Sequence, residues 1–512
     1  MIERMLTVGG YTLLSRVTGF IRDIIMAAVL GAGPVADAFF VAFRLPNHFR
    51  AIFAEGAFNA AFVPSYARIR EQGGAQRAGL FADHIYTLLL ASQIVLLAIA
   101  LIFTPQVLDV LAPGFSKDPE RYQLAVTLTR ITFPYLLLIT LVTLHGGILN
   151  ALQRFAAASA APILLNISLV VAMLLAAFFP TAGHAAAWGV LISGVLQAML
   201  VGGDAWWANA WTHLRWPELD ADVRQFFRAL GPATVGSAGV QLALFADTII
   251  ASFLPAGAIS ALYYADRINQ LPIGVIGIAA GTVILPEMSR RLAAGDTDGA
   301  MHAQSRAIEF TLLLSIPCLA AFAVVPDLIM RGLFLRGAFT AADAHAAGAT
   351  LAAYAIGLLP FVLIRSAVAT FFARGDTATP VKATLIAAAV NVAFKVLLMG
   401  PLAQVGLALA TSIGAWINLG LVVWFAHRGG HFRLDERLRR SALRLLLAGL
   451  VLAVALALAE SPLASWLAGW GRWRDLVTLT ALTALGGIVY GGAIALLFGR
   501  SWLMAFRAKR RR

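Results

Sequence analysis

Residues 88–103 of the chain read LLLASQIVLLAIALIF, a run of sixteen residues without a charged side chain. Comparable apolar runs occur at residues 164–179 and 443–458, and others recur along the whole length. A helix crosses a hydrocarbon core about 30 Å thick with roughly 20 mostly apolar residues. The recurrence of these runs predicts an all-α polytopic membrane protein rather than a soluble protein with one anchor.

The composition favours the same prediction. Of the 512 residues, 60% are hydrophobic and 13% are charged, whereas soluble domains are about 45–50% apolar and about 25% charged. The first ten residues carry Glu3 and Arg4, and the apolar stretch behind them is interrupted by Arg16 and Arg22. We therefore expect no cleavable signal peptide, so that retention in the membrane depends on the spans themselves.

Apolar runs and the Gly- and Pro-rich breakers between them predict fourteen helices. These are expected at residues 5–30, 35–68, 80–104, 121–149, 157–179, 186–210, 223–253, 257–289, 304–325, 343–373, 380–400, 405–427, 439–459 and 475–499.

Basic residues are distributed unevenly over the loops between these helices. With the N-terminus in the cytoplasm, 25 Lys and Arg fall on the cytoplasmic side and only six on the other. The six are Lys117, Arg121, Arg331, Arg336, Arg472 and Arg474. This asymmetry follows the positive-inside rule and predicts an even number of helices with both termini in the cytoplasm. The same bias accounts for the net charge of +13, and we expect the basic tail to contact anionic lipid headgroups rather than nucleic acid.

An internal repeat divides the chain. The segment DAFFVAFRL at residues 37–45 aligns with SALYYADRI at residues 260–268, an offset of 223. About six predicted helices separate the two copies, and an even number returns the chain to the same side, so we expect two parallel repeats. The predicted domains are an N-lobe at residues 1–212 with helices 1–6 and a C-lobe at residues 213–428 with helices 7–12. Residues 429–512 form a basic linker and two extra C-terminal helices.

The first two predicted helices are unusually charged. They contain Arg16, Arg22, Asp23, Asp37, Arg44, Arg50 and Glu55. A central Arg or Asp costs about 2.5–3.5 kcal/mol in a membrane helix, so several together must face a wet or paired interior. On a straight helix, Asp37, Arg44 and Glu55 lie within about 20° of one another.

Two interpretations of these charges remain open. The acids Asp23, Asp37 and Glu55 can pair with neighbouring arginines and only lock the helices together. The arginines outnumber the acids, and Arg267 in the second half adds another cation. A central cavity with surplus fixed arginines predicts an anionic substrate, because a guanidinium matches phosphate geometry.

Enzyme motifs are missing from the sequence. It contains no GxxxxGK[ST], HExxH, CxxC or GxSxG pattern. Residues 31–36 fit GxGxxA, but without a preceding strand and with Pro34 inside, so we expect an interhelical loop. His427 and His431 have helical metal spacing, but Gly429 and Gly430 lie between them and no acidic partner is close. We therefore expect a protein that is not an enzyme and binds no nucleotide.

Several longer motifs resemble a known family. They are SRV at 15–17 with GF at 19–20 and RD at 22–23, DAFFVAFRLPN at 37–47 with Arg50, FAEGAF at 53–58 with FVP at 62–64, YADR at 264–267, and GDT at 375–377 with TP at 379–380. With these residues the chain resembles the lipid II flippase family MurJ, also called MviN, within the superfamily of multidrug and polysaccharide exporters. The resemblance covers essentially the whole chain, including the two extra helices.

The resemblance implies a fold and a set of site residues. The fold is two six-helix lobes facing each other in a V around a central cationic cavity, with the extra helices forming a groove for the undecaprenyl tail. The substrate-binding residues that it implies are Arg16, Arg22, Arg50 and Arg267 for the diphosphate and sugar headgroup, with Asp37 and Glu55 as acidic functional positions. It also implies sodium as a coupling ion, bound by Asp247 and Asp376 with Asn391 as third ligand; no other cofactor is expected.

The implied activity is translocation of lipid II from the cytoplasmic to the periplasmic leaflet of the inner membrane. Alternating access driven by the membrane potential or an ion gradient, and not by ATP, is the expected mechanism. The expected partners are lipid II and membrane lipids, with no nucleic acid, and the expected state is a monomer. One alternative is an exporter of another polyprenyl-linked oligosaccharide or of drugs. The other, a membrane enzyme acting on polyprenyl phosphates, needs an acidic metal-binding cluster in a loop, and no loop here has one.

Overall fold

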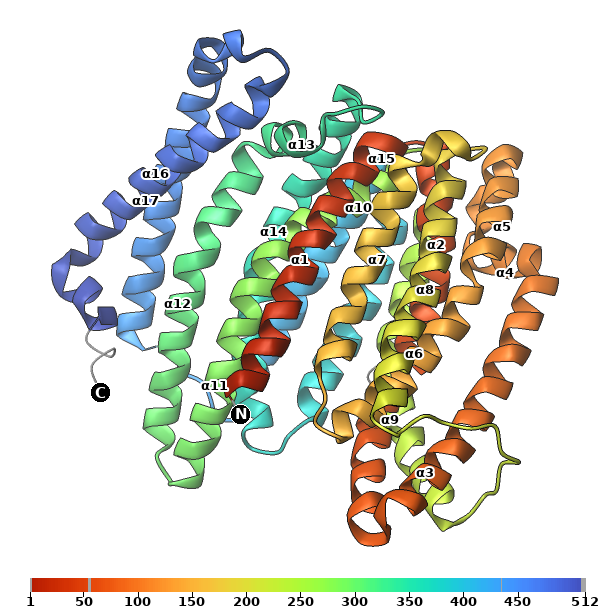
Figure 1. The fold of residues 1–512 in the computed structure, drawn as a ribbon. Coiled ribbons are helices and arrows are strands. Elements are labelled where there is room, and N and C mark those ends of the chain that lie inside the picture. The colour runs from red at the N-terminus through yellow and green to blue at the C-terminus, as the bar shows by residue number, and fades with distance from the viewer. Residues whose placement is uncertain (1, 54–56, 434, 508–512) are drawn as a thin grey trace. The chain divides into compact units, whose positions relative to one another are not determined.

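The computed structural model describes residues 2–53, 57–433 and 435–507, and within these residues it contains helices and no β-strand (Figure 1). The chain packs into two compact units. Unit 1 comprises Met1–Ser260 and Arg336–Phe339, and unit 2 comprises Ala261–Leu335 and Thr340–Arg512.

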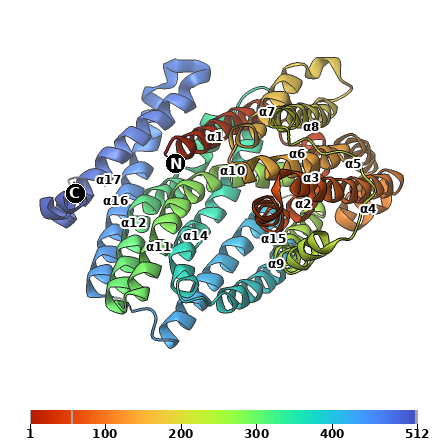
Figure 2. The same cartoon turned by 60° about the horizontal axis from the view of Figure 1, so that its bottom comes forward.

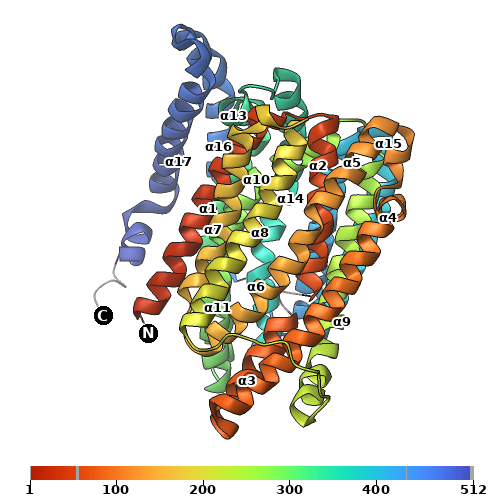
Figure 3. The ribbon, with the colours of Figure 1, turned by 45° about the vertical axis from the view of Figure 1, so that its right-hand side comes forward.

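Unit 1 is a bundle of helices joined by short turns. Its helices are α1 (Ile2–Leu30), α2 (Pro34–Phe53), α3 (Ala57–Ile102), α4 (Thr104–Leu111), η1 (Pro113–Lys117), α5 (Pro119–Thr132), α6 (Pro134–Ala151), α7 (Ala156–Leu174), η2 (Ala176–Phe178), α8 (Ala182–Trp207), α9 (Ala221–Ser252) and the first turn of α10 (Ala258–Pro272). Helix α1 packs against α7, α7 against α8, and α6 lies between α8 and α3 (Figure 3).

Unit 2 contains the remaining helices. They are the rest of α10, η3 (Ile273–Gly277), α11 (Ile278–Ala293), α12 (Thr297–Val324), α13 (Pro326–Phe334), α14 (Ala341–Phe372), α15 (Ala378–Arg428), α16 (Glu436–Trp466), η4 (Ala468–Trp473) and α17 (Arg474–Arg507). Helices α14 and α15 form a close pair, and α16 and α17 lie side by side with α16 packed on α12 (Figure 2).

Three long helices contain a break among the described residues: α17 near its end at Gly499, and α3 and α15 in the middle. Helix α3 contains Gly74 with φ 77° and ψ 178°, and α15 contains Ala403 with φ 46° and ψ −127°. The breaks in α3 and α15 fall at glycines 73–74 and just after Pro401, where the sequence predicts helix ends. Each of these two elements therefore holds residues from two of the predicted helices.

Ten helices among the described residues are long and apolar enough to cross a membrane, so this is a multi-pass membrane protein. The predicted number of fourteen is reached if α15 crosses twice, once on either side of its break, and if α1, α2 and α9 also cross. These three helices are not among the ten, and α1 and α2 carry the buried charges.

The compact units differ from the predicted lobes. The sequence predicts a boundary at residue 212 and a separate segment at residues 429–512. In the structure α9 packs with unit 1, because Phe226 joins an aromatic cluster with Phe58, Phe62 and Phe81 of α3. Helices α16 and α17 pack on α12 and α13 and belong to unit 2. A repeat marks similar segments of sequence, whereas compact units depend on which apolar faces meet.

The turn after α1 shows why one breaker is glycine. Gly31 has φ 66°, and a Cβ atom there would lie 2.7 Å from the carbonyl oxygen of Ala338. The backbone N–H of Ala338 also donates to the carbonyl of Ala28 at 2.7 Å. This positive φ and the close backbone approach both require glycine.

Candidate functional site

Asp37 lies at the start of α2 with its side chain fully buried. One carboxylate oxygen accepts hydrogen bonds from the Ser260 backbone N–H at 2.9 Å and the Ser260 hydroxyl at 2.6 Å. The other accepts from the Gly257 N–H at 2.7 Å. Gly257 immediately precedes α10 and Ser260 lies in its first turn, where free N–H groups and the positive dipole end favour a carboxylate. Asp37 thus ties α2 to the start of α10.

A buried arginine completes this network. The side chain of Arg121 from α5 is 5% exposed and stacks over the Phe115 ring at 4.1 Å. Its Nη1 lies 3.5 Å from Asp37 Oδ2, close enough for an ion pair, but neither Nη1 nor Nε has a hydrogen-bond acceptor among the described residues. Arg121 therefore balances the charge of Asp37 without taking over its hydrogen bonds.

The two ends of the Asp37–Ser260 hydrogen bond occupy equivalent positions of the internal repeat. Asp37 and Ser260 are equivalent positions in the two copies, 223 residues apart, and they are hydrogen-bonded to each other. The interpretation of Asp37 as a helix-locking residue describes this structure, since its carboxylate reaches no open space.

The side chain of Arg22 on α1 also forms hydrogen bonds with neighbouring side chains. Its Nε and Nη2 donate to Asp23 Oδ1 at 3.0 and 2.7 Å, and its Nη1 donates to Asn166 Oδ1 on α7 at 3.0 Å. Arg22 is 7% exposed and Asp23 is 3% exposed. The amide of Asn166 donates in turn to the Ser15 carbonyl and the Thr18 hydroxyl. Asp23 of α1 and Asn166 of α7 therefore fix the Arg22 guanidinium.

The other predicted substrate residues have different surroundings. Arg16 is exposed on α1, and Arg50 is half-buried in the last turn of α2. Glu55 lies outside the described residues, in the gap between α2 and α3, so its proposed alignment with Asp37 and Arg44 on one straight helix stays a prediction.

Arg267 is half-buried on α10 in unit 2, with its guanidinium 4.7 Å from the centre of the Tyr263 ring. Beginning six residues after Arg267, η3 is a π-helical segment at Ile273–Gly277. Single π-turns inside α-helices are frequent at functional sites because they reorient the side chains around them. The functional role of Arg267 itself stays a prediction.

The predicted sodium ligands do not form one group. Asp247 lies on α9 in unit 1. Asp376 lies just before α15 and accepts hydrogen bonds from Thr379 in the first turn of that helix. These hydrogen bonds hold the pKa of the Asp376 carboxyl below its ordinary value. Asn391 lies thirteen residues into that helix, about 20 Å further along the axis. Because even Ca²⁺ holds its oxygen ligands within about 2.6 Å, one ion cannot bind both Asp376 and Asn391. The three-ligand prediction is wrong in that respect, and sodium binding as such stays a prediction.

Three cavities within the units have none of the predicted site residues in their walls. They lie between α1, α7 and α8, between α11 and α12, and between α3 and α9. The described residues also contain no group of three or more His, Cys, Asp or Glu placed to hold a metal ion.

Sequence reasoning missed two residues of these networks. Asn166 interrupts the apolar run at residues 164–179, and a polar residue inside such a run is a signal that could have identified it. Arg121 was counted as a loop charge on the outer side. Nothing in its local sequence distinguishes it from the exposed Arg472, because its burial depends on Phe115 and Asp37.

The networks on α1 and α2 fall within the motifs that carried the family resemblance. A sequence model of the lipid II flippase MurJ family matches residues 26–472. The chain belongs to this family. A probable lipid II flippase MurJ of Rhizobium tropici is 38% identical over 507 residues, which cover 97% of this chain and 93% of the relative. The lipid II flippase MurJ of Burkholderia cenocepacia is 32% identical over 525 residues, covering 99% and 98%.

Solved structures support the fold of this MurJ family member. A lipid II flippase MurJ in an inward closed conformation superposes with a TM-score of 0.79 at 23% identity, covering 96% of this chain and 98% of that one. An inward-facing multidrug resistance transporter of the MATE family, in the MOP superfamily, gives a TM-score of 0.67 at 15% identity, covering 81% and 94%. The predicted all-α fold and the predicted family are confirmed.

Proposed function

We propose that the chain is a lipid II flippase that moves the undecaprenyl-diphosphate-linked peptidoglycan precursor from the cytoplasmic to the periplasmic leaflet. The observation that carries this function is the family match over residues 26–472, together with relatives that are similar over nearly their whole length. The likeness to multidrug transporters at 15% identity extends to the fold alone and favours no drug substrate.

We infer that transport proceeds by alternating access. This mechanism needs contacts that hold in one state and release in another. The hydrogen bonds that Asp37 accepts from Gly257 and Ser260 are suited to it, because they join the two sequence repeats through groups that water can replace. The energy source is proposed to be the membrane potential or an ion gradient; no change of covalent bonds is part of the proposal.

The arginines Arg16, Arg22, Arg50 and Arg267 are proposed to handle the diphosphate of lipid II. A guanidinium offers a planar fork of donors that an ammonium lacks, so lysine is expected to replace these residues poorly. Arg50→Ala and Arg267→Ala proteins are each expected to bind lipid II about tenfold more weakly or worse, the loss of one charge-assisted hydrogen bond. Equilibrium binding of lipid II to purified protein measures this effect.

The matched control is Arg439→Ala, which removes an arginine whose side chain is 77% exposed near the start of α16. It should bind lipid II like the wild type. If Arg50→Ala and Arg267→Ala also bind normally and support growth of a strain depleted of its own flippase, the arginines are structural and the diphosphate assignment is wrong.

We also propose an inner-membrane location with both termini in the cytoplasm, from the 25-to-6 distribution of basic loop residues.

Cysteine labelling tests this topology. In a functional chain with Cys318, the single cysteine, replaced, Gln72→Cys and Asp298→Cys should be protected from an impermeant thiol reagent added outside. Ser116→Cys and Gly469→Cys should react with it. All four positions are exposed; Gly114 is unsuitable because a Cβ atom there would lie 2.3 Å from the Ser252 carbonyl oxygen. Outside labelling of Asp298→Cys would overturn the topology.

A further inference from the structure

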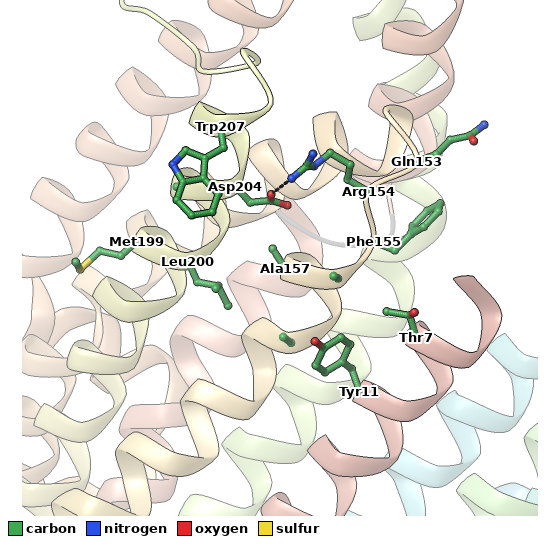
Figure 4. A pocket seen from close by; sticks show the side chains of 13 residues that line it. Thr7, Tyr11, Gln153, Arg154, Phe155, Ala157, Met199, Leu200, Asp204 and Trp207 are labelled. Carbon is green, nitrogen blue, oxygen red and sulfur yellow. Dashed lines mark hydrogen bonds and ion pairs between the residues drawn. The ribbon is translucent and has the colours of Figure 1, made fainter. Parts of the chain in front are cut away.

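A cavity of about 810 Å³ opens between α1, α7 and α8, wholly inside unit 1 (Figure 4). Its size lies within the usual range of ligand pockets, roughly 300–1,000 Å³. It takes no part in the networks around Asp37 and Arg22. Its position at the end of α8 and at the α6–α7 turn places it at one end of the helices, where a membrane protein meets lipid headgroups.

The rim of the cavity carries one charge of each sign. Arg154 of the α6–α7 turn donates through Nη2 to Asp204 Oδ1 of α8, and Figure 4 shows this pair beside Trp207. The side chains of Arg154 and Asp204 are 47% and 18% exposed. Within the part of the chain that is described, each forms its side-chain hydrogen bond with the other only. Most of the guanidinium donors and one carboxylate oxygen therefore remain available to a ligand.

Away from this ion pair, the lining of the cavity is largely apolar. Met199 and Leu200 of α8 and the small residues Ala157 and Ala160 of α7 line it, with Tyr11 of α1 on the opposite side. Figure 4 shows Met199 and Leu200 on the far side of Asp204 from the Arg154 head group. A ligand that fills the cavity therefore needs both a polar end at the rim and a hydrocarbon part.

Tryptophans place the rim at the level of the membrane interface. Trp206 and Trp207 in the last turn of α8 are 64% and 77% exposed. Exposed tryptophans gather where headgroups meet hydrocarbon, because the ring is apolar and its N–H is polar. From the rim, the exposed face of α8 continues through Met199, Leu196 and Ile192, a track that acyl chains can follow.

We propose that this cavity binds a membrane phospholipid with a zwitterionic phosphoethanolamine headgroup. The phosphate takes the open donors of Arg154, and the primary ammonium donates to the second oxygen of Asp204 beside the face of the Trp207 ring. The charge pattern selects this class, because a phosphate and an ammonium complement an Arg–Asp pair at both ends. A purely anionic headgroup would place negative charge against Asp204, and a choline headgroup has no N–H to give it.

The test is native mass spectrometry of the delipidated full chain titrated with three lipids of equal acyl chains. Phosphatidylethanolamine should bind about tenfold more tightly than phosphatidylcholine, the effect of losing one charge-assisted hydrogen bond, and phosphatidylglycerol should bind more weakly still. Asp204→Asn and Arg154→Gln should each lower phosphatidylethanolamine binding about tenfold. Gly203→Trp should abolish it, since a Cβ atom at Gly203 meets nothing within 4 Å and the new ring can occupy the cavity.

The chain offers a matched control in the Arg77–Asp222 pair of the same unit. It joins α3 to α9 at 2.8 Å, with side chains 54% and 14% exposed, and lies outside the cavity. Arg77→Gln and Asp222→Asn should leave phosphatidylethanolamine binding unchanged. Lipid II binding measured on the same samples should stay at the wild-type level, which shows that the variants are folded and separates this site from the flippase activity. Equal binding of the three lipids, or normal binding by Gly203→Trp, would overturn the proposal.

Discussion

Asp37→Ala is expected to destabilise the protein by roughly 3–5 kcal/mol, the cost of removing one partner from a buried ion pair. The substitution leaves the buried Arg121 guanidinium without its counter-ion and removes the acceptor for the N–H groups of Gly257 and Ser260. The measurement is the fraction of detergent-solubilised protein that stays monodisperse after heating over a range of temperatures. Transport should be lost as well, because the tie between α2 and the start of α10 is gone.

A double-mutant cycle separates the charge effect from a general loss of packing. Arg121→Met keeps the length of the side chain and removes the buried charge, so Asp37→Ala combined with Arg121→Met should be more stable than the sum of the single effects predicts. The expected coupling is about 1 kcal/mol or more. The control is Asp298→Ala, an exposed acid in the first turn of α12, which should be nearly silent. Strict additivity at Asp37 and Arg121 would show that the two side chains do not interact.

Arg22→Ala is expected to have a destabilising effect of similar size, because Asp23, which is 3% exposed in the wild-type structure, loses two hydrogen bonds from Nε and Nη2. Arg22→Lys should recover only part of the stability, since one ammonium cannot reproduce the bonds to both Asp23 and Asn166. Thermal stability in detergent and complementation of a flippase-depleted strain provide two independent readouts.

The double variant Arg22→Ala with Asp23→Ala removes both charges and should recover stability without recovering transport. Arg16→Ala is the internal control for stability, because this arginine is exposed on the same helix. If the double variant also transports normally, Arg22 only compensates the charge of Asp23 and has no part in handling the substrate. An Arg22→Ala protein as stable as the wild type would contradict the energetic argument itself.

Much of the fold follows from local sequence. Apolar runs locate the helices, because burial of apolar residues in hydrocarbon depends on composition and length more than on any neighbour. Helix ends are also predicted by local sequence. The predicted ends near Gly31, Gly74 and Pro401 coincide with the positive φ values at Gly31, Gly74 and Ala403. The compact units were less predictable, since they depend on pairs of faces such as Phe226 against the aromatic residues of α3.

The same distinction between local sequence and tertiary contacts applies to the candidate site. The sequence by itself determined that this is an all-α membrane protein of the MurJ family and that α1 and α2 carry charges that hydrocarbon does not tolerate. Only the tertiary structure decided the partners of those charges: Asn166 for Arg22, Ser260 and Arg121 for Asp37, and no common ion for Asp376 and Asn391. The physical reason is that the cost of a buried charge is a property of one residue, whereas its compensation depends on donors that distant segments bring within about 3 Å.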